Sequence, residues 1–129
     1  MSITVTPVAA AVIRQGERFL LAQRMPGKQF ADMWEFPGGK LEEGESLQQA
    51  LEREIREELC VEIRAGKVLH VAMSLGYMVV FLEAEIMSGD IQCVEAQDAR
   101  FFTVQEARAM ELPPSDRAAL EEMVRNGRL

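Results

Sequence analysis

Runs of apolar residues separated by turn signals predict a chain rich in β-strands. Each run is either continuously apolar or alternates with polar positions, and each ends near Gly, Pro or Ser. The predicted strands cover residues 3–13, 18–23, about 61–73, 77–87 and 99–102, and a short apolar stretch covers 34–36. Turns are expected at Gln15-Gly16 and at Ser88-Gly89-Asp90.

Helical spacing predicts one long central helix and two helices near the end of the chain. Ser46 can cap a helix over residues 46–59, and Thr103 with Glu106 has the spacing of a capping box. Residues 113–115 precede a final helix that ends near Gly127. The apolar positions of the central helix are Leu47, Ala50, Leu51 and Ile55. Strands and helices in this order predict an α/β (α+β) layered domain.

The size and composition predict one globular domain that covers residues 1–129. Of the 129 residues, 48% are apolar and 27% are charged, which is ordinary for a soluble domain. A chain of this length buries roughly two-thirds of its unfolded surface, so it needs neither a disulfide nor a metal to fold. No apolar run approaches the ~20 residues of a membrane span, and the N-terminus does not resemble a signal peptide. We therefore expect a cytoplasmic protein with no membrane partner.

The net charge of −7 argues against a protein that binds long nucleic acid. Such proteins usually carry a basic stripe, and the 14 Lys and Arg residues of this chain are scattered. A small phosphorylated ligand remains allowed, because bound divalent cations can reverse the local field. Cys60 and Cys93 have no CxxC spacing, so they suggest neither a disulfide framework nor a zinc site. His70 occupies a predicted strand position and is expected to be structural.

Three glutamates of the central helix are the candidate metal ligands. At about 100° per residue, Glu54, Glu57 and Glu58 continue the sector that holds the apolar stripe. Most charge-rich helix faces are simply solvated, but inward carboxylates repel one another and resist burial. A hard divalent cation such as Mg²⁺ would resolve this conflict, because it prefers carboxylate and phosphate oxygens. Gly38-Gly39, just before the helix, could present a backbone carbonyl to the same metal, although such a pair is more often a plain turn.

The segment from Gly39 to Val61 resembles the Nudix box. The box reads Gly, five residues, Glu, seven residues, Arg-Glu, an aliphatic residue, any residue, Glu-Glu, any residue, Gly and an aliphatic residue. Its elements in this chain are Gly39, Glu45, Arg53-Glu54, Ile55, Glu57-Glu58 and Val61. The one departure is Cys60, which stands in place of the glycine.

The resemblance extends over nearly the whole chain to the MutT-like pyrophosphohydrolases of the Nudix family. The shared order is strand, Ala-Gln-Arg, loop, Trp-Glu-Phe-Pro-Gly-Gly, helix, and a late Leu-Pro-Pro. It implies a mixed sheet sandwiched between helices. It also implies hydrolysis of a nucleoside triphosphate to a monophosphate and pyrophosphate, with Mg²⁺ as cofactor and Mn²⁺ as the alternative. A monomer is the default expectation, and a dimer remains possible.

The resemblance also implies roles for individual residues. Glu54, Glu57, Glu58 and the Gly38 carbonyl would bind the metal, while Arg53 and Glu45 would hold the loop and helix together. Arg24 matches a phosphate-contacting arginine. Glu95 matches a distal carboxylate that binds metal or helps to activate water, and its alternative is a plain exposed glutamate. Asp116 matches a base-reading residue, and its alternative is a favourable charge at a helix N-terminus.

The substrate's base stays open at this point. Members that hydrolyse 8-oxo-dGTP can use an arginine from the strand after the box, and residues 73–77 contain none. A pyrimidine triphosphate such as CTP or 5-methyl-dCTP is therefore an alternative. Residues that could line a base pocket, although such residues are more often core, are Trp34, Phe36, Tyr77 and Met78.

Two further functions also stay open. The chain could act on another nucleoside diphosphate derivative, such as a dinucleoside polyphosphate or nucleotide sugar, or it could be a non-catalytic nucleotide sensor. Such a sensor should have lost box carboxylates, and this chain keeps them.

Cys60 can adopt the left-handed conformation of the missing glycine only at a cost on the order of 1 kcal/mol, so the helix could end differently. We expect its thiol to be buried and inert, with an oxidation site as the alternative.

Overall fold

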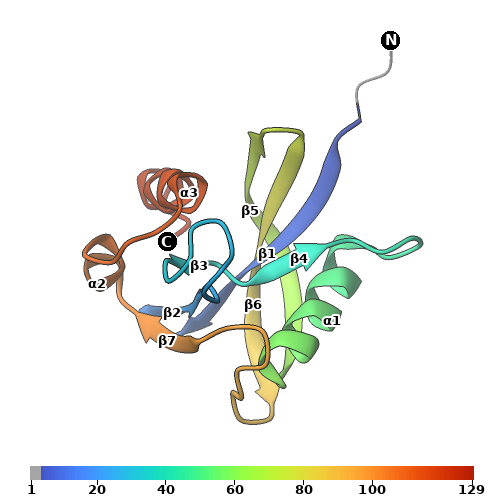
Figure 1. The fold of residues 1–129 in the computed structure, drawn as a ribbon, viewed down its shortest axis with the longest axis horizontal. Helices are drawn as coiled ribbons and strands as arrows, with labels where there is room; N and C mark the ends of the chain where they lie inside the picture. Colours follow the sequence, from blue (N-terminus) through green and yellow to red (C-terminus); the bar gives the residue numbers. More distant parts are fainter. Residues whose placement is uncertain (1–3) are drawn as a thin grey trace.

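A seven-stranded mixed sheet forms the centre of the molecule, with helices on both faces (Figure 1). The structure, a computed structural model, describes residues 4–129. Its elements in chain order are β1 (Thr6–Gln15), β2 (Arg18–Gln23), β3 (Trp34–Glu35), β4 (Gly38–Lys40), α1 (Leu47–Leu59), β5 (Glu62–Ser74), β6 (Tyr77–Ser88), β7 (Asp98–Phe102), α2 (Val104–Arg108) and α3 (Pro114–Arg125). No helix within residues 4–129 is long and apolar enough to cross a bilayer.

The strand order combines parallel and antiparallel pairs. The main path runs β3-β2-β1-β6-β5, with β4 also paired to β1 and β7 also paired to β2. β1 and β6 are parallel, and the other pairs are antiparallel. The expected mixed sheet between helices is therefore confirmed.

β1 holds the two layers of the fold together because it is buried on both faces. Ala9, Ala11 and Ile13 belong to the apolar cluster on the α1 side of the sheet, whereas Ala10 and Val12 belong to the cluster on the α3 side. This division follows from the alternation of side chains along a strand. The helix residues that complete the two clusters are Leu51, Ile55 and Leu59 of α1, and Ala119, Leu120 and Met123 of α3.

Most predicted strands are present, with small differences at their ends. The first predicted strand is displaced, because β1 runs from Thr6 to Gln15, and residue 3 lies outside the described residues. β4 was not predicted, because two of its three residues are glycines and no alternation of side chains marks it. It is a strand because Gly38, Gly39 and Lys40 pair with Ala10, Ala9 and Val8 of β1. The reading of Gly38-Gly39 as a plain turn is therefore wrong.

Both ends of α1 are defined by specific backbone contacts. The Ser46 hydroxyl accepts a hydrogen bond from the Gln49 N–H (3.1 Å), and the Gln49 side chain accepts one from the Ser46 N–H (2.9 Å). At the other end Cys60 is left-handed, with φ 61° and ψ 26°, and its N–H donates to the Arg56 carbonyl (3.1 Å). The helix thus ends as it would with glycine. Cys60 is exposed, so the expectation of a buried thiol is wrong.

We expect Cys60→Gly to stabilise the protein. Glycine adopts a left-handed conformation without the Cβ penalty, so the free energy of unfolding should rise by about 1 kcal/mol in urea denaturation. Cys60→Ala is the matched control, because alanine keeps the Cβ atom and should bring no such gain. Equal midpoints for the two variants would contradict the interpretation.

Candidate functional site

The Arg53 side chain fixes the loop before α1 to the helix itself. Its Nε and Nη2 atoms donate to the two carboxylate oxygens of Glu45, at 2.7 and 3.0 Å. Nη2 also donates to the Lys40 carbonyl oxygen (3.1 Å), which ties the guanidinium to the end of β4. These hydrogen bonds lower the pKa of Glu45 and raise that of Arg53. A planar guanidinium is suited to this task because its donors point in several fixed directions.

Glu54 is held between Arg53 and the backbone of Gly39. Arg53 Nη1 donates to Glu54 Oε1 (2.9 Å), and only 17% of the Glu54 side chain is exposed. A Cβ atom added at Gly39 would stand 2.4 Å from the Glu54 carboxyl carbon. A glycine at position 39 therefore leaves room for this carboxylate beside β4.

Glu58 lies among other carboxylates. Burial is the main cause that raises its pKa to about 9, and the charges of Glu54, Glu35 and Glu95 add to the rise. A bound cation would oppose this rise in the pKa of Glu58, because a nearby opposite charge favours the ionised carboxylate. The group lies beside the glycine pair and one turn from the position of Glu54 on α1.

Glu57 does not share this environment. Its side chain is 53% exposed and accepts a hydrogen bond from Arg53 Nη1 (3.2 Å), so the expectation that it points inward is wrong. The buried side of α1 is centred on Leu51, Ile55 and Leu59. Glu57 follows Ile55 by two positions, or about 200°, whereas Glu58 follows it by three and returns to within about 60°.

The donor set suits a hard divalent cation, although it is not arranged as a finished metal site. Within the part of the chain that the structure describes, no three His, Cys, Asp or Glu side chains are grouped so that they could hold a metal ion. Arg53 donates hydrogen bonds to both Glu54 and Glu57. The oxygen chemistry and the mutual repulsion around Glu58 nevertheless fit Mg²⁺ better than a softer metal.

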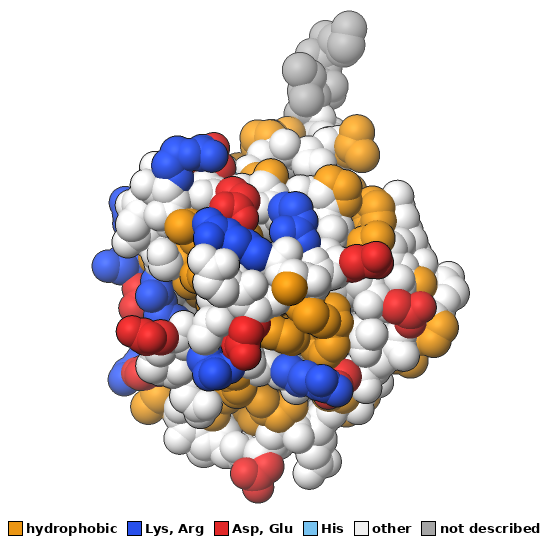
Figure 2. All heavy atoms as spheres, turned by 90° about the vertical axis from the view of Figure 1, so that its left-hand side faces the viewer, with side chains coloured by type: hydrophobic (Ala, Val, Ile, Leu, Met, Phe, Trp, Pro, Cys, Tyr) orange, Lys and Arg blue, Asp and Glu red, His pale blue; other side chains and the backbone are white. Residues whose placement is uncertain are grey.

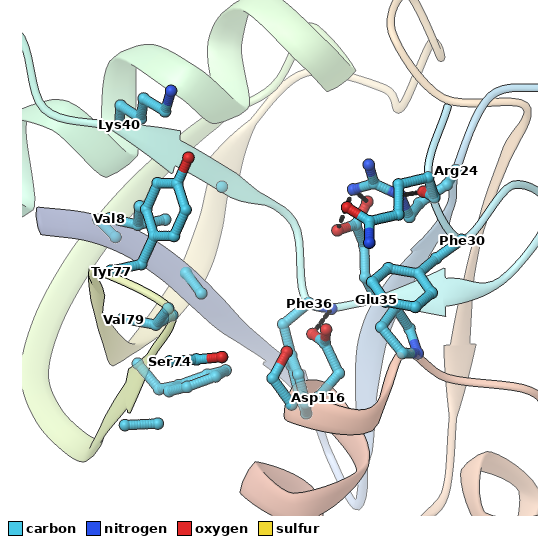
Figure 3. A pocket seen from close by; sticks show the side chains of 18 residues that line it. Val8, Arg24, Phe30, Glu35, Phe36, Lys40, Ser74, Tyr77, Val79 and Asp116 are labelled. Atoms are coloured by element: carbon cyan, nitrogen blue, oxygen red, sulfur yellow. Dashed lines mark hydrogen bonds and ion pairs between the residues drawn. The ribbon is translucent and has the colours of Figure 1, made fainter. Parts of the chain in front are cut away.

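An apolar pocket of about 400 Å³ opens on the other side of the glycine pair (Figure 3). Phe36 and Asp116 lie at one end, and Tyr77 lies on the opposite wall with Lys40 above it. The Lys40 ammonium is 5.6 Å from the centre of the Tyr77 ring. Apolar walls with a few polar groups are typical of a site for a flat organic ligand.

A second, more polar pocket of about 470 Å³ contains the acidic cluster, which consists of Glu35, Glu58 and Glu95. It is lined by Glu58 and Glu95 together with Lys28. The two pockets share four lining residues, which are Arg24, Glu35, Gly38 and Lys40. The apolar pocket and the acidic cluster are therefore two parts of one continuous surface.

The boundary between the two pockets is an ion pair between Arg24 and Glu35, which no local sequence pattern indicates. Arg24 Nη1 donates to both carboxylate oxygens of Glu35, at 2.9 and 3.0 Å, and Arg24 Nε donates to the Gln29 carbonyl (2.8 Å). Burial raises the pKa of Glu35 although Arg24 opposes the rise. The one signal for Glu35 was its place between Trp34 and Phe36, where a charged residue interrupts an apolar run.

Asp116 lies at the apolar end of the pocket, at the start of α3. Its Oδ1 atom accepts a hydrogen bond from the Phe36 N–H (3.1 Å). Burial is the main cause that raises its pKa to about 7, and the charge of Glu35 adds to the rise, while Arg24 and the Phe36 hydrogen bond oppose it. Both protonation states of Asp116 are therefore accessible near neutral pH.

The four residues considered for a base pocket divide between pocket and core. Phe36 lines the pocket but is also core, with only 4% exposed and its ring 5.7 Å from that of Phe19. Tyr77 lines the pocket and is 40% exposed. Trp34 packs against Phe102 in the core, and Met78 packs on the α1 side of the sheet. Neither Trp34 nor Met78 lines the pocket.

Replacing Asp116 by asparagine should change how stability depends on pH. Below about pH 4 the carboxyl is protonated in both the folded and the unfolded state. Between pH 4 and about 7 the Asp116 carboxyl ionises in the unfolded chain but stays protonated in the folded one. The wild type therefore loses about 1.4 kcal/mol of stability per pH unit over this range. Asparagine keeps the acceptor for Phe36 without this loss. Urea denaturation without nucleotide should therefore show Asp116→Asn gaining on the wild type as pH rises, and a constant difference between them would contradict this.

Comparison with known proteins assigns the chain and its fold to one family. A family profile described as NUDIX domain matches residues 4–125. The chain is 37% identical over 118 residues to a CTP pyrophosphohydrolase of Escherichia coli, covering 88% of this chain and 87% of that protein. It is 45% identical over 60 residues to an 8-oxo-dGTP diphosphatase of Haemophilus influenzae, covering 46% and 44%.

Solved structures agree with this assignment. The crystal structure of a MutT NUDIX hydrolase from Burkholderia pseudomallei has a TM-score of 0.80 at 27% identity, covering 92% of this chain and 97% of that one. The solution structure of the E. coli ORF135 protein has a TM-score of 0.76 at 35% identity, covering 92% and 88%. With the profile over nearly the whole chain and a full-length relative above one-third identity, the protein belongs to the Nudix family of hydrolases.

Proposed function

We propose that this protein hydrolyses a nucleoside triphosphate to a nucleoside monophosphate and pyrophosphate, with Mg²⁺ as cofactor. The observation that carries the proposal is the shared boundary of the two pockets. An apolar pocket sized for a base meets an acidic, oxygen-rich pocket at Arg24, Glu35, Gly38 and Lys40. A ligand that fills both is flat and apolar at one end and anionic at the other, as a nucleotide is.

The base is assigned to the apolar pocket. Phe36 and Tyr77 offer ring surfaces on two sides, and Asp116 lies where it can hydrogen-bond the base edge. With its pKa near 7, Asp116 can accept a hydrogen bond from an exocyclic amino group or donate one to a ring nitrogen. Cytosine presents such an amino donor next to a ring-nitrogen acceptor.

The triphosphate is assigned to the acidic pocket, where the chain supplies positive side chains for the phosphates and carboxylates for the metal. Lys40, Arg24 and Lys28 line it and offer positive charge to phosphate oxygens. Glu54, Glu58, Glu95 and the Gly38 carbonyl are the groups that would hold the metal. Glu57, which is exposed and bound to Arg53, would join them only by releasing Arg53. Bound Mg²⁺ would neutralise the triphosphate and favour the attack of water on phosphorus.

The remaining charged residues hold these groups in place. Arg53 and Glu45 fix α1 against β4, and thereby set the distance from Glu54 to the glycine pair. Glu95, on the loop that faces Glu58, is the candidate for orienting the attacking water. Phosphoryl transfer asks a protein mainly for such positioning and charge stabilisation.

A pyrimidine triphosphate is the substrate that we favour, and 8-oxo-dGTP is the second candidate. The wall that β5 and β6 contribute to the pocket consists of Ala72, Ser74, Tyr77, Val79 and Phe81, and offers no arginine to read an oxidised purine. The relative that matches over most of both chains is named for CTP. The relative named for 8-oxo-dGTP matches over less than half of each chain.

The ligand is a small nucleotide rather than long nucleic acid. The chain carries a net charge of −7. On the face that Figure 2 shows, Lys and Arg side chains are interspersed with Asp and Glu and form no continuous basic stripe. Counterion release along a polyanion needs such a stripe.

The first test is a substrate panel with a metal control. We expect release of pyrophosphate from CTP or 5-methyl-dCTP that needs Mg²⁺ and that falls at least about 100-fold in Glu54→Gln. The panel should include the common NTPs and dNTPs and 8-oxo-dGTP. Glu17→Gln, in the exposed turn between β1 and β2, is the matched control and should keep the full rate. No turnover of any triphosphate by a folded protein would refute the proposal and favour a different diphosphate or a sensor.

The two neighbouring glycines should respond differently to alanine. At Gly39 the three atoms nearest to the new Cβ all belong to the carboxylate end of the Glu54 side chain, which can rotate away, so Gly39→Ala should fold but lose about 100-fold in rate by displacing this carboxylate. At Gly38 the Cβ would stand 1.9 Å from the Ala9 carbonyl oxygen, so Gly38→Ala should lose about 3 kcal/mol of stability. Thermal denaturation and pyrophosphate release separate the two effects. A Gly39→Ala enzyme of normal rate would contradict the placement of Glu54.

A further inference from the structure

The two cysteines of the chain lie on segments that the fold brings together. Cys60 ends α1, and Cys93 lies in the loop between β6 and β7. The Gln92 N–H donates to the Leu59 carbonyl at 3.0 Å, so the residues just before each cysteine are directly joined. Figure 1 shows the same loop passing the C-terminal end of α1.

Additional contacts hold this loop against the end of the helix. The Val94 N–H donates to the Glu58 carbonyl (2.9 Å), so Cys93 stands between two backbone hydrogen bonds to α1. A Cβ added at Gly89 would lie 3.1 Å from the Cys60 carbonyl oxygen, which shows that the start of the loop also packs there.

Both thiols are free and exposed, and the proposed reaction uses neither. Their separation in the sequence gave no sign of pairing. A disulfide requires Cα atoms within about 7 Å and side chains that can turn toward each other. The two backbone hydrogen bonds bring the segments that carry the cysteines together, and both cysteines are exposed rather than packed in the core.

We propose that Cys60 and Cys93 form a redox-active dithiol that a hydroperoxide converts to an intramolecular disulfide. One thiolate attacks a peroxide oxygen, the O–O bond breaks, and a sulfenic acid and hydroxide form. The second thiol then attacks the sulfenic sulfur, the S–S bond forms, and the S–OH group leaves as water. In sum two thiols and one hydrogen peroxide give one disulfide and two waters.

The disulfide would fasten the loop that carries Glu95 to the helix that carries Glu58. It would also close the chain between residues 60 and 93 into a loop. This loop lowers the conformational entropy of the unfolded state more than that of the folded state. The oxidised protein should therefore melt at a higher temperature than the reduced one. A thiol reductant should reverse both changes by exchange.

The test uses the full chain, reduced and then treated with hydrogen peroxide. After alkylation the oxidised chain should carry no alkyl group, and its intact mass should be lower by two hydrogen atoms than that of the reduced, unalkylated chain. A non-reducing tryptic digest should join the peptides 57–64 and 68–100, which contain the two cysteines. Dithiothreitol should separate them and return the melting temperature to its reduced value.

Two variants control the test. Cys93→Ser should keep the hydrolytic rate in its reduced form but give no joined peptide, and peroxide should not raise its melting temperature. Cys60→Gly should likewise give no joined peptide and no rise in melting temperature with peroxide. It is expected to fold well, because the backbone at position 60 is left-handed. Separate oxidation of each cysteine to sulfinic acid in the wild type, or disulfides only between chains, would overturn the proposal.

Discussion

No side chain fits between β4 and β1 at Gly38, where an added Cβ would stand 1.9 Å from the Ala9 carbonyl oxygen. This contact brings the backbone of the glycine pair onto the central strand. It leaves Gly39 facing α1, where the Glu54 carboxylate occupies the space that another residue would fill. Arg53 then closes the arrangement by joining Glu45 and the Lys40 carbonyl to the helix. The position of the acidic cluster therefore depends on the approach of two backbones, and not on the helix alone.

Much of this arrangement was predictable because local rules control it. The strands and the Ser46 cap follow from alternation and capping chemistry. The Arg53–Glu45 contact is instead what the resemblance to the Nudix box implies. β4 was missed because a strand of two glycines and a lysine exists through its partner and not through its own pattern. The inward placement of Glu57 was wrong because a helical wheel gives angles but not the direction of the core. That direction is set by the sheet against which the helix packs.

The tertiary features that the sequence could not show are those that join distant segments. Glu35 contacts Arg24 and influences both Asp116 and Glu58, although these residues come from four parts of the chain. Its importance arises from the boundary between two pockets, which no local pattern describes. The neighbourhood of Cys60 and Cys93 is a similar case, because a loop after β6 folds back on the end of α1.

The two pockets are built from different kinds of sequence. The acidic pocket takes its glycine pair and Glu58 from one continuous stretch, residues 38–58, and adds Glu35 from β3 and Glu95 from a loop. The apolar pocket is assembled from β1, the loop after β2, the ends of β5 and β6, and the start of α3. Substitutions in these scattered positions can reshape the recognition of a base while the reacting groups stay untouched. A lineage can thus acquire new substrates by drift around an unaltered reaction centre, which makes the chemistry easy to inherit and the specificity easy to change.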